Sequence, residues 1–244
     1  MNDKEQIELK IIDAMRISCS ETFYFSEDET RLIDAEYLFT VNVAKEIVKL
    51  NSGIGYPLKI YLEHPTKKFA TNCVPLMGRN PVTNRMTIRK KSRNTERNGK
   101  IDVAVYRDGV SFVKPVCAIE LKGFNPQRKV ILEDLKRNVE YFDFCCESGS
   151  SQISFTVFAA MHSCKNIRNK ASVLSNENEV KTKYEGWLSE LCQSINFKCD
   201  INVFTLDKNL AEDQVVPLGE ELTDFDSHQF IGVVVTFTAN QENK

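Results

Sequence analysis

Two short runs of sequence decide how this chain folds. Residues 100–109 read Lys-Ile-Asp-Val-Ala-Val-Tyr-Arg-Asp-Gly, and residues 116–123 read Val-Cys-Ala-Ile-Glu-Leu-Lys-Gly. Both runs are rich in β-branched and apolar residues, and the Asp-Gly pair that ends the first run is a turn signal. The pattern predicts two strands joined as a hairpin.

The charged residues of this hairpin are expected on one face of the sheet. Alternate side chains of a strand share a face, which places Asp102 with Ala104 on the first strand, and Glu120 with Lys122 on the second. Burying a charge near apolar neighbours costs free energy unless the charge is paired or binds a metal. We therefore expect these residues to serve function rather than stability.

The tripeptide acid-x-Lys is not informative by itself. It occurs five times, starting at Glu8, Glu120, Asp134, Glu179 and Glu242. The copy at Glu120 stands apart because it ends an apolar strand, follows an Asp-bearing strand and stops at a glycine. This context selects Glu120 and Lys122 as site candidates.

The arrangement resembles the PD-(D/E)XK nuclease superfamily. The pattern of that superfamily is an acid on a first helix, an Asp on a strand, and (Asp/Glu)-x-Lys on the next strand. Asp102 matches the strand Asp and Glu120-Leu-Lys the second half, with seventeen residues between the two acids. Ile101 stands where the family name has proline. The resemblance covers residues 30–161 and implies a restriction-endonuclease-like fold.

The resemblance also implies roles for individual residues. Asp102 and Glu120 would ligate Mg²⁺, for which Mn²⁺ is expected to substitute, and the Leu121 carbonyl would be an additional ligand. Lys122 would orient or help to deprotonate water and stabilise developing charge. Glu36 would complete the shell or hold a second ion. Carboxylate oxygens are the hard ligands that Mg²⁺ prefers.

Glu36 lies in a helix expected over residues 26–50. The helix begins with the capping-box sequence Ser-Glu-Asp-Glu. Its apolar stripe is formed by Leu32, Phe39, Val43, Ile47 and Leu50. Glu36 falls within that stripe. It is either an edge residue that reaches water or a third acid directed at the strand carboxylates, and the acid on the family's first helix favours the second interpretation.

A basic run precedes the first strand of the hairpin. Residues 79–100 contain one acid, Glu96, and a local charge of +7. The basic residues are Arg79, Arg85, Arg89, Lys90, Lys91, Arg93, Arg97 and Lys100. A solvated loop would explain such a run, but its position beside the carboxylates favours binding to a phosphate backbone. Further contacts to the phosphate backbone are expected from Arg128, Lys129, Lys136 and Arg137, for which an ordinary charged face is the alternative.

The remaining pattern predicts an α/β protein with a central mixed β-sheet flanked by helices. Helices are expected over residues 4–17, 130–146 and 184–195, strands over 58–63, 153–161, 200–206 and 230–238, and a surface loop over 166–183. We expect one domain over residues 1–244, with an N-terminal helix and an acidic C-terminal strand region. Between positions 209 and 243 the chain has seven acids and no Lys or Arg.

Composition limits the classes of function. The net charge of −2 excludes a uniformly basic coat, so any contact with nucleic acid must be local. There is no apolar run of about 18 residues, which argues against a membrane-spanning helix, and no signal peptide is expected. The eight cysteines lack Cys-x-x-Cys spacing. They are interpreted as reduced residues of a cytoplasmic protein.

Three functions are compatible with these patterns. The leading one is a metal-dependent endonuclease of the restriction or defence type, with DNA rather than RNA as the expected substrate. The sequence leaves undecided whether the protein forms a homodimer. The second is a non-catalytic nucleic-acid-binding or interaction module on the same fold. The third is an enzyme acting on another phosphate compound. The presence of Asp102, Glu120 and Lys122 together favours catalysis, and the basic run favours a polymeric substrate.

Overall fold

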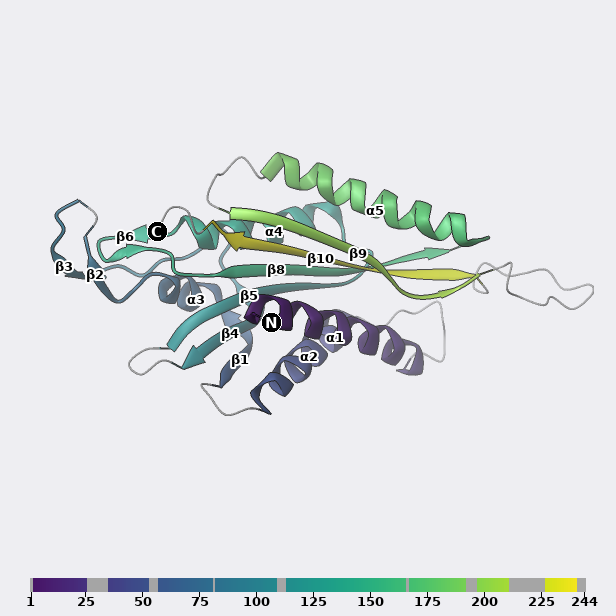
Figure 1. Cartoon of the computed structure of the whole chain (residues 1–244), viewed down its shortest axis with the longest axis horizontal. Coiled ribbons are helices and arrows are strands. Elements are labelled where there is room, and N and C mark those ends of the chain that lie inside the picture. The colour runs from purple at the N-terminus through teal and green to yellow at the C-terminus, as the bar shows by residue number, and fades with distance from the viewer. Residues whose placement is uncertain are drawn as a thin grey trace, which may run out of the picture.

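The computed structural model has a six-stranded mixed sheet at its centre, in the order β1-β4-β5-β8-β10-β9 (Figure 1). It describes residues 2–25, 35–52, 57–80, 82–108, 113–165, 167–191, 197–210 and 227–240. The strands are β1 (Leu58–Pro65), β4 (Lys100–Asp108), β5 (Val113–Phe124), β8 (Phe155–Lys165), β9 (Phe197–Asn209) and β10 (His228–Ala239). The β5–β8 pair is parallel and every other neighbouring pair is antiparallel. The α/β class and the central mixed sheet are therefore confirmed.

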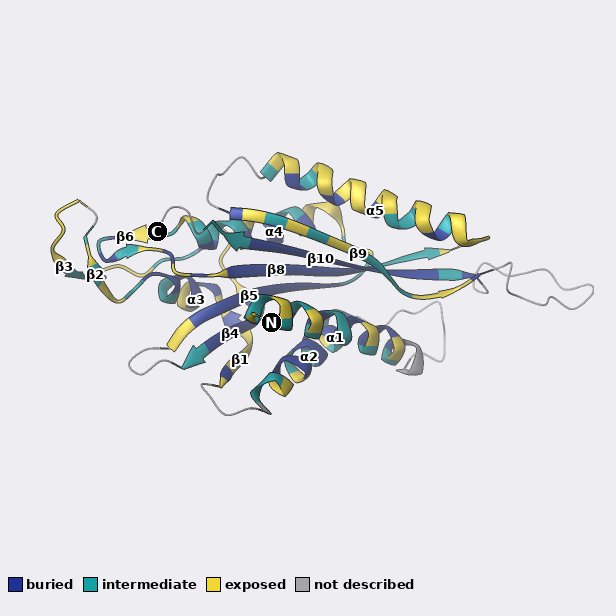
Figure 2. Ribbon diagram, viewed as in Figure 1, coloured by how far each residue is buried: buried dark blue, intermediate teal, exposed yellow. Residues whose placement is uncertain are grey.

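Helices cover both faces of this sheet. On one face lie α1 (Asp3–Phe25) and α2 (Ala35–Val48), the latter followed by the 3-10 helix η1 (Lys49–Ser52). On the other face lie α3 (Thr66–Cys73), α4 (Arg128–Asp143) and α5 (Lys170–Leu191). Figure 2 shows buried residues along the central strands and exposed residues on the outer sides of α1 and α5. The strands that carry the site thus lie between two helical layers.

The stripe expected on the second helix is confirmed where the structure describes it. Phe39, Val43 and Ile47 are fully buried and pack in one cluster with apolar residues of β4 and β5. Leu50 packs against the same cluster and is partly buried. The expected cap at residue 26 and the stripe residue Leu32 lie outside the described residues. Packing of this stripe fixes α2 above the hairpin.

Helix α1 is longer than its predicted range of residues 4–17. It continues to Phe25 because its polar C-terminal half finds partners inside the protein. The Thr22 hydroxyl donates to the Ser18 carbonyl at 2.7 Å, and the Asn42 amide of α2 donates to the Ser18 hydroxyl at 3.1 Å. Satisfied polar groups can be buried at little cost, so the helix does not need to stop at the serine.

The prediction of a surface loop over residues 166–183 is wrong. Helix α5 begins at Lys170, and its buried residues form a narrow stripe of Val173, Val180, Tyr184 and Leu188. The first half of this helix has only two buried apolar anchors among many polar residues. Such a sparse stripe is sufficient for a helix that packs with one side on the edge of a sheet.

Two small hairpins lie together at one end of the molecule, at the left of Figure 1. The first is formed by β2 (Met77–Arg79) and β3 (Met86–Ile88), and the second by β6 (Cys145–Cys146) and β7 (Gly149–Ser150). A Cβ atom at Gly78 would lie 2.0 Å from the Ser148 carbonyl oxygen, so only glycine permits this contact. Thr87 donates to the Glu147 carbonyl at 2.6 Å. The β2–β3 hairpin is therefore anchored at its base.

The cysteines in the described segments are free thiols. Cys19, Cys73, Cys117 and Cys146 are buried, and burial raises the pKa of Cys19 to about 12. A thiol with such a raised pKa is an unreactive core residue. Among the described helices, none is both long and apolar enough to cross a membrane.

Candidate active site

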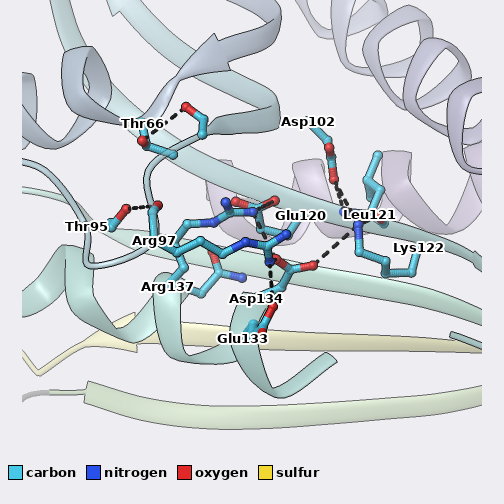
Figure 3. Close-up of polar contacts among 12 residues, drawn as sticks. Thr66, Thr95, Arg97, Asp102, Glu120, Leu121, Lys122, Glu133, Asp134 and Arg137 are labelled. Atoms are coloured by element: carbon cyan, nitrogen blue, oxygen red, sulfur yellow. Dashed lines mark hydrogen bonds and ion pairs between the residues drawn. The ribbon is translucent and has the colours of Figure 1, made fainter. Parts of the chain in front are cut away.

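The β4–β5 hairpin brings Asp102 next to the Glu120-Leu-Lys sequence, as predicted (Figure 3). The two strands pair from Val103 opposite Ile119 towards the turn. One position further, the Asp102 carboxylate accepts a hydrogen bond of 2.6 Å from the Leu121 amide. This contact holds the carboxylate beside β5.

Lys122 is the centre of the candidate site. Its Nζ donates to Glu36 Oε1 and to the Leu121 carbonyl, both at 2.8 Å. It also forms ion pairs with Asp134 Oδ2 at 3.3 Å and with Asp102 Oδ2 at 3.9 Å. One ammonium therefore joins acids from α2, β4 and α4.

Glu36 reaches the cluster because α2 comes very close to the end of β5. A Cβ atom at Gly123 would lie only 3.1 Å from the Glu36 backbone nitrogen. The Glu36 side chain is 39% exposed, so it touches both water and Lys122. Of the two interpretations of Glu36, the geometry agrees with an acid directed at the cluster.

Glu120 is buried against Arg137, which the sequence suggested as a phosphate contact near the site. Arg137 Nη2 donates to Glu120 Oε2 at 2.5 Å and to Asp134 Oδ1 at 3.0 Å (Figure 3). Glu120 and Asp134 are fully buried, and Arg137 is 5% exposed. Because Arg137 is enclosed in this way, it is not free to contact a phosphate backbone.

The sequence holds a signal for the burial of Asp134, although this residue was not predicted as a site residue. The buried residues of α4 include Ile131, Asp134, Asn138 and Tyr141, which follow one another at steps of three and four. Polar residues thus occupy positions of an apolar stripe. The acid-x-Lys tripeptide that starts at Asp134 gives no information about its role. Its position within the apolar stripe of the helix, however, indicates that the side chain is buried.

The cluster contains more acids than bases. Four carboxylates, from Glu36, Asp102, Glu120 and Asp134, meet the cations of Lys122, Arg137 and Arg97. Arg97 Nη1 lies 2.7 Å from Asp134 Oδ1. An excess of negative charge in a largely enclosed cluster favours uptake of a proton or of a cation.

Burial shifts the pKa values in this cluster. Loss of solvent raises the pKa of Asp102 to about 6, against the opposing effect of the Lys122 ammonium. Loss of solvent also raises the pKa of Glu120 well above its ordinary value, although Arg137 opposes the shift. For Lys122, burial lowers the pKa, but the surrounding acids outweigh burial and the net pKa is raised. The lysine is therefore an ammonium at neutral pH.

The donor set fits the chemistry of a hard divalent cation. As the side chains lie, the described residues include no group of three or more His, Cys, Asp or Glu side chains arranged to hold a metal. However, Glu120 Oε1 is buried and accepts no hydrogen bond. A buried carboxylate oxygen without a donor is costly, and a cation bound by Glu120 and Asp102 would remove that cost. Mg²⁺ takes oxygen ligands of this kind.

Several residues of the predicted nucleic-acid surface have partners within the protein. Arg97 pairs with Asp134, Lys100 with Glu63 at 3.4 Å, and Arg128 with Glu190 at 3.2 Å. Arg89 Nη1 donates to the backbone carbonyls of Thr71 and Val74. Arg93 is half-buried, with its Nε enclosed. In this structure, these residues stabilise the fold around the site through contacts within the protein.

Other residues of the basic run are exposed. Arg79, Arg85, Lys90 and Lys91, together with Lys129 beyond the run, form no ion pair with any acid in the described part of the chain. The first four lie on or beside the β2–β3 hairpin. They are the members of the predicted nucleic-acid surface that remain available for a ligand.

No protein-family model, no curated protein and no solved structure matches this chain. The functional assignment therefore depends on the residues of the site and their chemistry.

Proposed function

We propose that this protein is a metal-dependent nuclease with a restriction-endonuclease-like fold, and that it hydrolyses phosphodiester bonds of DNA as an endonuclease of the restriction or defence type. One observation carries the proposal. Lys122 contacts Glu36 from a helix at 2.8 Å, and Asp102 from the neighbouring strand at 3.9 Å, beside Glu120 on its own strand. The acid on the helix, the Asp on the strand and the Glu-x-Lys sequence thus lie close together, which is the arrangement expected from the superfamily pattern.

The cation would be Mg²⁺ or Mn²⁺, which supplies Lewis acidity and charge neutralisation at the scissile phosphate. Asp102, Glu120 and the Leu121 carbonyl would hold it. Asp102 is already oriented by the Leu121 amide, so its carboxylate is positioned before any ion binds. Glu120 offers the buried oxygen that accepts no hydrogen bond.

Lys122 acts as a cation in this proposal. Its raised pKa, which the neighbouring acids maintain against burial, opposes a role in deprotonating water. An ammonium at this place can orient a water molecule and stabilise the negative charge that develops on phosphate oxygens. Glu36 holds the ammonium at the mouth of the cluster and keeps it directed towards the substrate.

The proposed substrate is DNA bound through the basic run. Arg79, Arg85, Lys90 and Lys91 are exposed cations that can neutralise phosphates. The free thiols in the described segments agree with a reducing compartment such as the cytoplasm.

A non-catalytic nucleic-acid-binding module is the second candidate, and one contact favours it. Arg137 donates a hydrogen bond of 2.5 Å to Glu120 Oε2. A cation of the protein itself is therefore already bound to one oxygen of the proposed metal ligand. In such a module the ion pair would replace the metal, and the basic surface would bind DNA without cleaving it.

A cleavage assay separates the two candidates. Supercoiled plasmid, linear duplex, single-stranded DNA and RNA are incubated with the protein and Mg²⁺ or Mn²⁺, with and without EDTA. We expect metal-dependent cleavage of DNA that Asp102→Asn abolishes, and nicking of the plasmid as the mark of an endonuclease. Asp108→Asn is the matched control, because Asp108 lies at the other end of β4 and pairs with Lys59. DNA binding without cleavage at any metal concentration would establish the binding module instead.

A further inference from the structure

The β2–β3 hairpin exposes large apolar side chains that the proposed phosphate contacts do not explain. Five of the twelve exposed large hydrophobic residues in the described part of the chain lie between positions 76 and 88. They are Leu76, Met77, Val82, Met86 and Ile88. Val82, at the turn, is 90% exposed. Apolar surface concentrated in one place commonly marks a binding site.

The same hairpin is strongly basic. Residues 76–93 contain six Lys and Arg residues and no acid. Arg79 and Arg85 flank the turn, and Lys90 and Lys91 follow β3; all four are exposed. A partner must therefore be negatively charged and must also accept apolar side chains.

The turn holds Val82 in an outward position. Asn80 Oδ1 accepts hydrogen bonds of 2.9 Å from the backbone N–H groups of both Val82 and Thr83, and the backbone N–H of Asn80 donates to the Arg85 carbonyl at 2.8 Å. Asn84 closes the turn with a φ of 54°, in the left-handed region that Asn tolerates. The backbone that carries this apolar side chain is thus hydrogen-bonded to Asn80.

The base of the hairpin is fixed to the body of the protein. Gly78 lies against Ser148, Thr87 donates to the Glu147 carbonyl, and Arg89 donates to the carbonyls of Thr71 and Val74 at the end of α3. The Arg89 amide also donates to the Leu76 carbonyl at 2.9 Å. A load on the turn would therefore be transmitted to the body of the protein.

We propose that the β2–β3 hairpin is an arm that enters a groove of duplex DNA and places Val82, with Met86 behind it, against the base pairs. This inference rests on the DNA partner of the proposed function but not on its chemistry. A two-stranded ribbon fits a DNA groove, and an apolar wedge between base steps bends the duplex. The flanking cations would hold the phosphates on both sides of the groove.

The test measures DNA binding and bending in EDTA, where no cleavage interferes. The full chain is titrated with a duplex of about 30 base pairs labelled at both ends for energy transfer, a length at which protein-induced bending is measurable. We expect binding to bring the two ends closer. Val82→Ser combined with Met86→Ser should weaken duplex binding about tenfold, which corresponds to burial of roughly one apolar side chain. It should also abolish the change in energy transfer.

The control variant is Leu174→Ser, which removes an apolar side chain of 61% exposure from α5. It should bind and bend DNA as the wild type does. The double variant and the control should both melt at the wild-type temperature, because the changed residues are exposed. The salt dependence of binding should also stay the same in the double variant, since no cation is removed.

The outcomes distinguish the arm from the nuclease. Wild-type binding and bending by the double Ser variant would overturn the arm even if the protein cleaves DNA. A loss of bending in that variant, with no cleavage by the wild type under any condition, would support the proposed arm and refute the proposed nuclease activity. Absence of duplex binding by the wild type would overturn the arm, and an acidic protein surface would then be the partner that the charge indicates.

Discussion

Arg137 of α4 donates a hydrogen bond of 2.5 Å to Glu120 of β5, and solvent reaches neither side chain to more than 5%. Removing one partner of such a pair leaves the other charge buried and uncompensated. We expect Arg137→Met to lower the free energy of unfolding by about 3–5 kcal/mol. The double change of Arg137→Met with Glu120→Met should recover part of this loss. Urea denaturation of the wild type, the two single variants and the double variant measures the coupling.

The neighbouring Lys136 provides the control for this cycle. Lys136 pairs with Glu96 at the surface at 2.6 Å, and exposed pairs contribute little. Lys136→Met should leave the unfolding midpoint unchanged. Equal effects of the two substitutions would show that Glu120 does not depend on Arg137.

Asp102→Asn should stabilise the fold at neutral pH while it abolishes cleavage. Burial raises the pKa of Asp102 to about 6 from its ordinary value of 3.8. Between these two pH values the folded state binds more protons than the unfolded state, so this carboxylate lowers stability as the pH rises. The variant should therefore gain up to about 3 kcal/mol at pH 8, and the gain should vanish below about pH 4.

Urea midpoints at both pH values measure this effect, with Asp108→Asn as the control at the turn end of β4. The asparagine side chain introduced by the substitution can still accept a hydrogen bond from the Leu121 amide, so the local geometry is kept. A loss of stability at pH 8 would show that Asp102 is stabilised as a carboxylate and that burial does not dominate.

Glu36→Gln should slow cleavage without changing DNA affinity. The change removes the charge that holds Lys122 Nζ at 2.8 Å. Loss of one interaction in the transition state corresponds to about a tenfold lower kcat. Glu185→Gln, an exposed acid on α5, should cleave normally. If kcat is also normal in Glu36→Gln, Glu36 is an edge residue whose contact with Lys122 has no role in the reaction.

The exposed members of the basic run should set the salt dependence of DNA binding. Changing Arg79, Arg85, Lys90 and Lys91 to Ala should weaken binding to every sequence alike and flatten the slope of log affinity against log salt by about 3–4. Mn²⁺ affinity, measured by calorimetry, should stay unchanged. Unchanged DNA affinity and slope in the fourfold variant would identify a solvated surface.

Arg89→Ala is the contrasting variant within the same run. Arg89 donates to the Thr71 and Val74 carbonyls, so its loss should loosen the base of the hairpin and lower the melting temperature. The fourfold variant should melt as the wild type does, because its changed residues are exposed.

His162 should make stability depend on pH in the acid range. Burial, and to a lesser degree the Lys183 charge, lower the pKa of His162 to about 4, and its Nε2 meets the Tyr184 hydroxyl at 3.0 Å. Between its ordinary pKa of 6.5 and about 4 the unfolded state binds the extra proton, so stability falls as the pH falls. The loss should approach about 3 kcal/mol at pH 4. In urea denaturation at several pH values, His162→Gln should remove this part of the pH dependence of the free energy of unfolding. The same pH dependence in the variant and the wild type would contradict the role of His162.

The sequence predicted the hairpin and its charged face because a strand repeats every two residues. Asp102, Glu120 and Lys122 could be placed on one face without any knowledge of the other elements. The position of Glu36 followed from the helix period and from the family resemblance. Local periodicity thus accounts for the part of the site that two adjacent strands and one helix supply.

The sequence did not predict the part of the site that depends on packing between distant elements. The position of α4 on β5 decides which oxygen of Glu120 contacts Arg137. It also decides that Asp134 pairs with three cations. The start of α5 was missed for a related reason, since its sparse stripe is recognisable only against the sheet that it covers. Arg89 and Arg97 have the pattern of surface charges, and only the folded chain reveals their partners on α3 and α4.

The close approach at Gly123 makes the site sensitive to a single carbon atom. A methyl group at this position would stand 3.1 Å from the Glu36 nitrogen, and the helix would have to retreat to admit it. Because Glu36 moves with its helix while Lys122 moves with its strand, the distance between the carboxylate and the ammonium is set by backbone clearance. A side chain after the lysine would therefore shift the carboxylate relative to the ammonium even in a chain that keeps all four charged residues of the pattern, so the clearance at Gly123 helps to set the contact between Glu36 and Lys122.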